Sequence, residues 1–112
     1  MSSTEPNSSV PQLTTEQLTA ARAAAAEARR RRAEVKDRVR TGDLSLAEVL
    51  ALAARDDVVA HIKVVDLLRC LPRVGEVRAS AMMDTLRIAP NRRVRGLGAR
   101  QQAKLLQKVE MT

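Results

Sequence analysis

The chain has 112 residues, of which 45% are hydrophobic and none is aromatic. That length fits one small domain with a core of Leu, Val, Ala and Met, and the lack of aromatic rings excludes the stacking platforms of single-strand binders and sheet-based RNA readers. The formal net charge of +7 indicates a nucleic acid or an anionic membrane surface as the partner.

Several other classes of protein find no support in the sequence. No apolar run approaches the roughly 18 residues of a membrane span, and residues 1–11 lack the basic and apolar regions of a signal peptide. The single Cys70 forms no internal disulfide, suits a reducing, cytoplasmic setting and is expected to be buried beside its neighbouring leucines. No cofactor or metal site is expected, and the lack of grouped catalytic side chains predicts that the protein is not an enzyme.

Charge is unevenly distributed along the chain. Residues 73–104 hold eight Lys or Arg against two acids, a net charge of +6, and residues 27–40 hold seven against three, a net charge of +4. Residues 43–66 hold two basic residues against five acids, a net charge of −3. Basic surfaces are therefore expected on the first helix and on the C-terminal part of the chain.

The pattern predicts a tail followed by one basic, helical domain. Residues 1–12 are rich in Ser, Asn and Pro and lack periodicity, which predicts a disordered tail. Residues 13–112 are expected to form the domain, with a long basic helix within residues 13–42 and a helical body over residues 43–112.

The long helix has clear start and stop signals. Thr14 and Gln17 form a capping box at its start, and Gly42 supplies a left-handed residue at its end. The apolar stripe is nearly all alanine in the first half, whereas Val35 and Val39 in the second half can anchor in a core. The second half is therefore expected to pack on the body while the first half projects.

Four arginines at residues 29–32 wrap around this helix where its halves meet. Such a run is usually a solvated face, but a rod of about 40 Å is long enough to lie across a DNA groove, so Arg31 and Arg32 are candidate DNA contacts. Dimerisation through this helix is the structural alternative. Because Arg32 occupies a seam position in a weak stripe, we expect the free protein to be a monomer.

The body begins with three shorter features. A second capping box, Ser45 with Glu48, starts an amphipathic helix. A short turn over residues 57–61 leads to a third helix. His61 is interpreted as a surface residue of that turn, with a phosphate contact as the alternative. Pro72 ends the third helix, because the residue before a proline is pushed out of the helical region.

A tight turn within residues 71–79 joins the third helix to a fourth. The run Leu-Pro-Arg-Val-Gly resembles the hairpin of helix-hairpin-helix and helix-two-turns-helix DNA-binding folds, where turn amides hold a phosphate without reading bases. Arg73 stands where the usual motif has its first glycine and adds a charge near the expected phosphate. The resemblance makes Arg73, Val74, Gly75 and Arg78 candidate contacts. The buried face of the fourth helix is expected to comprise Ala79, Met82, Met83 and Leu86.

The most informative stretch is residues 92–98, Arg-Arg-Val-Arg-Gly-Leu-Gly. Crowded guanidiniums repel one another, so a fixed cluster indicates an anionic partner, and glycines let backbone amides approach that partner closely. The helix that follows adds its free N-terminal amides. Phosphate binding is therefore predicted for Arg92, Arg93, Arg95, Gly96 and Gly98.

The last helix continues this basic surface. Arg100, Lys104 and Lys108 follow one another at i, i+4 and i+8, and Arg100 and Lys104 are candidate DNA contacts. Val94 and Leu97 in the preceding loop are interpreted as anchors that pack into the core rather than as wedges between bases.

Taken together, these segments resemble the actinobacterial, mycobacterial-type integration host factor family. The resemblance covers residues 13–109 and is carried by the Ala-rich basic helix with Arg-Arg-Ala-Glu-Val-Lys at 31–36, the hairpin at 71–79 and the cluster at 92–98. It implies an all-α fold, in which a long N-terminal helix packs on a small helical bundle containing a helix-two-turns-helix module.

The resemblance also implies a function. Members of the family are nucleoid-associated proteins that bind duplex DNA largely without sequence preference, bend or compact it and assist phage integration. Double-stranded DNA is then the expected partner, joined by a phage integrase–DNA complex, with Arg92, Arg93 and Arg95 as DNA contacts. An RNA- or ribosome-binding helical module is the alternative, because a related hairpin occurs in a small-subunit ribosomal protein.

Overall fold

The computed structural model describes residues 13–111, so the tail expected at residues 1–12 lies outside the described residues. Within the described range the regular elements are all helical, as predicted. They are α1 (Thr15–Arg40), α2 (Leu46–Ala53), α3 (Asp57–Ala60), α4 (Val64–Cys70), α5 (Glu76–Thr85), the 3-10 turn η1 (Val94–Gly96) and α6 (Ala99–Glu110). None of these helices is long and apolar enough to cross a membrane.

Both ends of α1 form as the sequence predicts. At its start the Thr14 side chain accepts from the Gln17 amide at 3.0 Å, and the Gln17 side chain accepts from the Thr14 amide at 2.8 Å. At its end Gly42 adopts a φ of 84°, and the Asp43 amide donates to the Arg38 carbonyl at 2.8 Å. This left-handed cap turns the chain sharply back toward the body.

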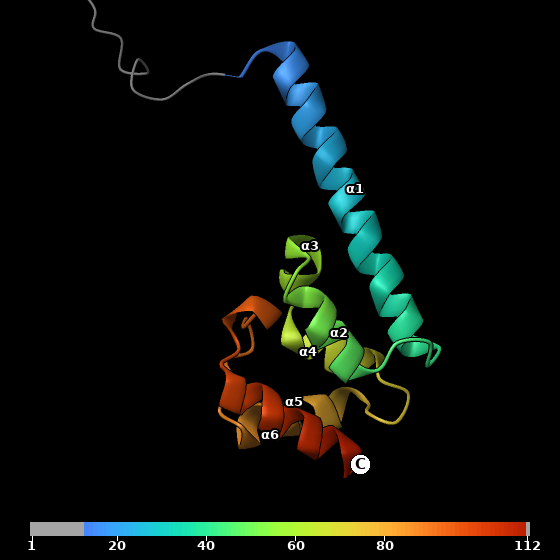
Figure 1. The fold of residues 1–112 in the computed structure, drawn as a ribbon, viewed down its shortest axis with the longest axis vertical. Coiled ribbons are helices and arrows are strands. Elements are labelled where there is room, and N and C mark those ends of the chain that lie inside the picture. Colours follow the sequence, from blue (N-terminus) through green and yellow to red (C-terminus); the bar gives the residue numbers. More distant parts are fainter. Residues whose placement is uncertain (1–12, 112) are drawn as a thin grey trace, which may run out of the picture.

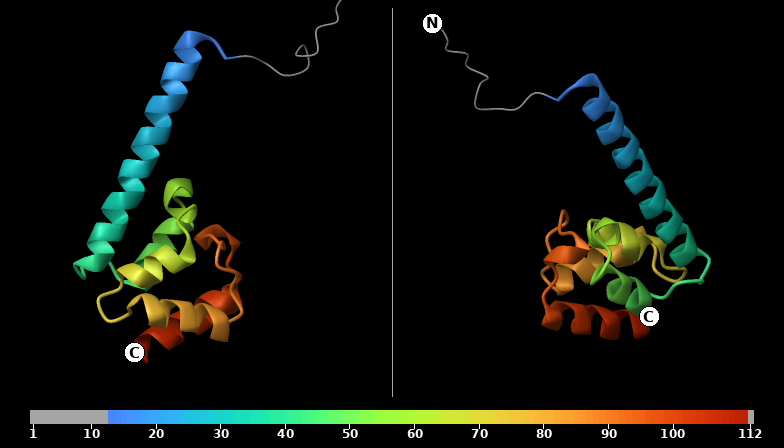
Figure 2. Two further views of the ribbon diagram at one scale, coloured as in Figure 1. Left: turned by 180° about the vertical axis from the view of Figure 1, so that it is seen from behind. Right: turned by 45° about the horizontal axis from the view of Figure 1, so that its top comes forward.

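The two halves of α1 have different surroundings. Val35 and Val39 are buried where the second half packs on α3 and α4, whereas every residue from 15 to 27 is exposed. Figures 1 and 2 show the first half projecting away from the body. The radius of gyration is 18.5 Å, compared with about 13 Å for a compact chain of 100 residues. The packed and projecting halves predicted from the valine and alanine patterns are confirmed.

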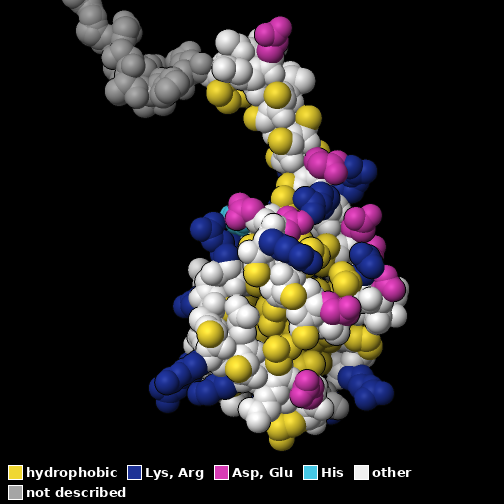
Figure 3. All heavy atoms as spheres, viewed as in Figure 1, with side chains coloured by type: hydrophobic (Ala, Val, Ile, Leu, Met, Phe, Trp, Pro, Cys, Tyr) yellow, Lys and Arg dark blue, Asp and Glu magenta, His cyan; other side chains and the backbone are white. Residues whose placement is uncertain are grey.

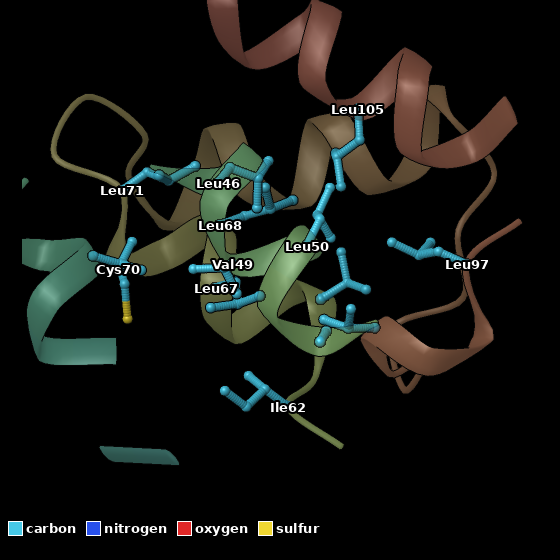
Figure 4. Packing of buried hydrophobic residues seen from close by; sticks show 14 of the residues in the cluster. Leu46, Val49, Leu50, Ile62, Leu67, Leu68, Cys70, Leu71, Leu97 and Leu105 are labelled. Atoms are coloured by element: carbon cyan, nitrogen blue, oxygen red, sulfur yellow. The ribbon is translucent and has the colours of Figure 1, made fainter. Parts of the chain in front are cut away.

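The core of the body is aliphatic. Leu67, Leu68 and Leu105 are among the largest fully buried side chains, and α2, α4, α5, α6 and the loop before α6 all contribute to the same cluster (Figure 4). Burying a side chain of this size stabilises the fold by about 1.5–3 kcal/mol. Cys70, Met82 and Met83 are buried as well, which confirms their interpretation as core residues.

Two local features differ from the sequence expectations. The turn expected at residues 57–61 contains the single-turn helix α3, started by the Asp56 side chain, which accepts from the Val58 amide at 3.0 Å. One turn is too short to show a helical period in the sequence. Beyond α5, Arg87 adopts a φ of 56° in a cap where glycine is the usual residue, so the sequence carried no signal for that cap.

Candidate nucleic-acid interface

The arginine loop, residues 92–98, is fastened to the body by its backbone and by its apolar residues. Val94 and Leu97 are buried, with 3% and 7% of their surfaces exposed. The Val94 amide donates to the Ile62 carbonyl at 2.9 Å, and the Val64 amide donates to the Arg92 carbonyl at 3.0 Å. Val94 and Leu97 are therefore core anchors, as predicted, and they hold the loop in one position.

Contacts within the protein orient all three arginines of this loop. Arg92 Nη1 donates to the Gly96 carbonyl at 2.8 Å, and Arg93 Nη1 donates to the His61 carbonyl at 2.5 Å. Arg95 Nη1 lies 3.1 Å from His61 Nε2. A guanidinium has five N–H donors, so each of these contacts leaves donors for an anionic partner. Arg93 and Arg95 are exposed and Arg92 is half-buried.

His61 joins the site in a way that sequence reasoning missed. It ends α3, its Nδ1 lies 2.7 Å from the Asp57 carbonyl, and its carbonyl and Nε2 face Arg93 and Arg95. A neutral ring with its proton on Nδ1 satisfies both ring contacts. The interpretation of His61 as a plain turn residue has to be extended, because more than 30 residues separate it from the arginines that it supports.

The two glycines of the loop occupy different environments. A Cβ added to Gly96 would lie 2.7 Å from Arg92 Cδ, so Gly96 lets the Arg92 side chain fold across the loop. Gly98 has open space on that side and precedes α6, where its amide donates to Gln101 Oε1 at 3.1 Å. The group that lies close to Gly96 in this structure is therefore the Arg92 side chain of the protein itself.

The hairpin, residues 71–79, places basic side chains at a second location. Leu71 and Val74 are buried, so Val74 can reach a partner only through its backbone. Gly75 starts α5 without a side-chain cap, which leaves the first amides of α5 available to a ligand. Arg73 and Arg78 are exposed, and Arg78 Nη1 lies 3.4 Å from the Arg73 carbonyl.

Helix α6 connects the two locations. Its N-terminus follows the arginine loop, and Val109 and Glu110 near its C-terminus line a hollow of about 300 Å³ together with the hairpin. Arg100 and Lys104 are exposed on the outer side of this helix, whereas Leu105 is fully buried on the inner side. The basic row therefore begins beside the arginine loop and runs in the direction of the hairpin.

The arginine loop and the hairpin are not neighbours. Figures 1 and 2 show them at opposite ends of α6, whose 12 residues span about 18 Å. In Figure 3, Lys and Arg side chains stand out at both margins of the body. The structure thus brings together each group of predicted residues separately and joins the groups through α6.

The two candidate arginines of α1 have different surroundings. Arg31 forms an ion pair with Asp56, which links α1 to the start of α3. Burial acts to raise the pKa of Asp56, but hydrogen bonds from Arg31 and from two backbone amides outweigh it and hold that pKa below its ordinary value. Arg32 is half-buried and lines a small pocket that Arg93 also lines.

Within residues 13–111, no group of three or more His, Cys, Asp or Glu side chains could hold a metal ion. What this part of the chain offers a ligand is a set of guanidiniums, ammoniums and helix-terminal amides. All of these groups donate hydrogen bonds, and most carry positive charge. Fold and site together therefore define a small helical protein with a basic, hydrogen-bond-donating surface.

Comparison with known proteins identifies the family. A family profile described as an S13-like H2TH domain matches residues 39–109. The chain is 50% identical to the integration host factor of Mycolicibacterium smegmatis, over 92% of this chain and 98% of that protein. It is 52% identical to the integration host factor of Mycobacterium tuberculosis, over 88% of this chain and 94% of that protein.

A solved structure shares the fold. It is described as the structure of sIHF bound to an 8bp palindromic DNA, and it is 48% identical in sequence with a TM-score of 0.73. The match covers 76% of this chain and 96% of that one. The protein described here belongs to the mycobacterial-type integration host factor family, and its body is an H2TH domain.

Proposed function

We propose that this protein binds duplex DNA through backbone phosphates, largely without regard to sequence. The observation that carries the proposal is the arginine loop, in which buried anchors and internal hydrogen bonds hold three guanidiniums at the surface. Guanidiniums and helix-terminal amides suit phosphate oxygens, and contacts to the backbone position DNA without reading bases. The palindromic DNA bound to the related sIHF supports the same partner.

The proposed role is architectural and not enzymatic. A nucleoid-associated protein of the cytoplasm that bends, bridges or compacts DNA would also assist phage integration, acting on an integrase–DNA complex. The proposed unit is a monomer when free of DNA. Burial of Val35 and Val39 against the body supports this, because it removes the strongest part of the α1 stripe from any seam between two chains.

The direct test removes one arginine of the loop. Arg93→Ala is expected to lower affinity by a similar factor for unrelated duplex sequences, because the contact is to a phosphate. The plot of log K against log salt is expected to become shallower by about 0.9 for one lost phosphate contact. Fluorescence anisotropy with two unrelated duplexes over a range of salt concentrations measures both effects. An unchanged slope would remove Arg93 from the interface.

Binding to structured RNA is the second candidate function. The S13-like description of the matching domain favours keeping it, as does the related hairpin of a small-subunit ribosomal protein. Competition between a labelled duplex DNA and an RNA stem-loop of equal length separates the two. The proposal expects DNA to be displaced only by a large excess of RNA, and displacement by equimolar RNA would favour the alternative.

A further inference from the structure

A small basic pocket lies between α1 and the arginine loop. It has a volume of about 80 Å³ and is lined by residues from α1, from residues 61–66 at the start of α4 and just before it, and from the loop. The charged or polar lining residues are Arg32, Lys36, His61, Lys63, Asp66 and Arg93. Three segments that are distant in sequence thus contribute cations to one pocket.

Positive charge in this pocket is not balanced within the described residues. Arg32, Lys36 and Lys63 make no side-chain ion pair or hydrogen bond with any residue between 13 and 111. The one acid of the lining, Asp66, faces a fifth cation, since its Oδ1 lies 3.7 Å from Arg69 Nη1. Four cations around a pocket with one shared carboxylate repel one another unless an anion joins them.

The fold holds these cations in place. Arg32 and Lys36 are one turn apart on α1 and half-buried, on the part of the helix that Val35 fastens to the body. Lys63 and Arg93 face each other across an antiparallel backbone bridge. A water molecule occupies about 30 Å³ in the liquid, so the pocket has room for a tetrahedral oxyanion.

We propose that this pocket binds a phosphate group, held by Arg32, Lys36, Lys63 and Arg93. The phosphate comes either from the backbone of the bound duplex or from a free diphosphate. With duplex as the source, the inference rests on the proposed function and makes the second half of α1 part of the same interface as the arginine loop.

Two measurements distinguish the sources. The first compares the salt dependence of duplex binding in wild type and in the double variant Lys36→Gln, Lys63→Gln. A phosphate lost from the pocket makes the slope shallower by about 0.9. The matched control is Arg22→Gln, which removes an exposed cation from the projecting half of α1, outside the pocket. If the control changes the slope as much for each charge removed, the effect comes from overall charge and the duplex is ruled out as the source of the phosphate.

The second measurement titrates the full chain with inorganic pyrophosphate and follows backbone amide signals by NMR. Chemical-shift changes of the backbone amides of residues 63 and 93 that disappear in the double variant support a site for free diphosphate. Shifts without a change in the duplex slope support the pocket as a separate phosphate site. A change in slope without shifts supports a site for duplex phosphate alone.

A substitution that is expected to strengthen binding shows that the effects of the other variants do not come from misfolding. Asp66→Asn removes the only acid of the pocket and is expected to strengthen pyrophosphate binding severalfold, with an unchanged far-ultraviolet circular dichroism spectrum. If neither the slope nor the amide signals depend on the pocket cations, the inference is wrong. Failure of the wild type to bind duplex would instead remove the proposed function and leave the pyrophosphate titration to decide on the pocket.

Discussion

Each arginine of the loop is already oriented before any partner arrives. Arg92 bonds to its own loop, and Arg93 and Arg95 bond to His61. Ordering a long side chain on binding costs about 0.5–1.5 kcal/mol, so arginines fixed in advance bind a phosphate with a smaller loss of entropy. The clustered arginines alone predicted the ligand, but the contacts that orient them depend on residues distant in sequence.

Gly96 is expected to be required for the position of Arg92. In Gly96→Ala the new Cβ would lie 2.7 Å from Arg92 Cδ, so the Arg92 side chain must move and lose its hydrogen bond to the residue 96 carbonyl. We expect the free energy of unfolding to fall by about 0.5–1.5 kcal/mol, the usual value of one such bond. Urea unfolding followed by circular dichroism measures the change.

A double-mutant cycle tests the cause of that loss. In an Arg92→Ala background the Gly96→Ala substitution meets no guanidinium side chain, so its cost is expected to fall close to zero. Equal costs in the two backgrounds would show that the loop backbone, and not Arg92, needs the glycine.

Asp56 is expected to make stability depend on pH. Its pKa in the folded protein is below the ordinary value of 3.8, so the charged carboxylate stabilises the fold above that value, and this stabilisation is lost as the pH falls through the folded-state pKa. Asp56→Asn keeps a good N-cap for α3 but removes the charge. Wild type is therefore expected to be the more stable protein at pH 7, with the difference shrinking as the pH falls from 3.8 through the folded-state pKa of Asp56.

Thermal unfolding at several pH values between these limits measures the effect. Glu34→Gln is the control, because Glu34 is exposed in the middle of α1 and makes no ion pair within residues 13–111. A difference between wild type and Asp56→Asn that stays constant with pH would contradict the assignment to the Arg31–Asp56 pair.

At the scale of the helices, the sequence predicted where helices start and end better than it predicted how they pack. The capping boxes at Thr14 and Ser45 and the left-handed Gly42 form in the structure. These signals are local, since a cap involves residues three to five positions apart. Helix α3 was missed because one turn held by a single capping aspartate has no period that a sequence can display.

The two halves of α1 are expected to differ in their effect on stability. Val39→Ala opens a cavity where α1 packs on the body and is expected to cost about 2 kcal/mol of unfolding free energy. Ala24→Gly lowers the intrinsic helix propensity by about 1 kcal/mol, but it lies in the exposed half, which can fray without unfolding the core.

Two readouts separate these effects. The urea midpoint of Ala24→Gly is expected to match that of wild type, while its circular dichroism signal at 222 nm is weaker. Val39→Ala is expected to shift the midpoint and keep the native signal. A midpoint shift of similar size in Ala24→Gly would mean that the projecting half contributes to the cooperative fold.

For the whole molecule, the positions of the basic groups suggest how DNA is bound. The arginine loop and the hairpin lie at opposite ends of α6, about 18 Å apart along that helix. A separate duplex contact at each end is the arrangement that bridging two duplexes requires. Bridging of two duplexes is accordingly expected to need both the arginine loop and the hairpin, whereas binding of a single duplex needs only one of them.

Neutralising the basic side chains of either the hairpin or the arginine loop tests this expectation. Arg73→Gln with Arg78→Gln disables the hairpin, and Arg93→Gln with Arg95→Gln disables the arginine loop. Each double variant is expected to bind a single labelled duplex within about tenfold of wild type, yet to lose energy transfer between two duplexes carrying different dyes. Energy transfer that persists in both variants would show that another surface joins the duplexes.

The sequence by itself determined the helical class, the helix caps, the aliphatic core and the identity of the arginine cluster. These properties depend on local periodicity and composition, which survive in a linear string. Only the tertiary structure decided that His61 supports two arginines, that Arg31 is held by Asp56 and that Arg32 and Arg93 line one pocket. Such contacts join residues more than 20 positions apart, and their formation depends on how the whole chain packs.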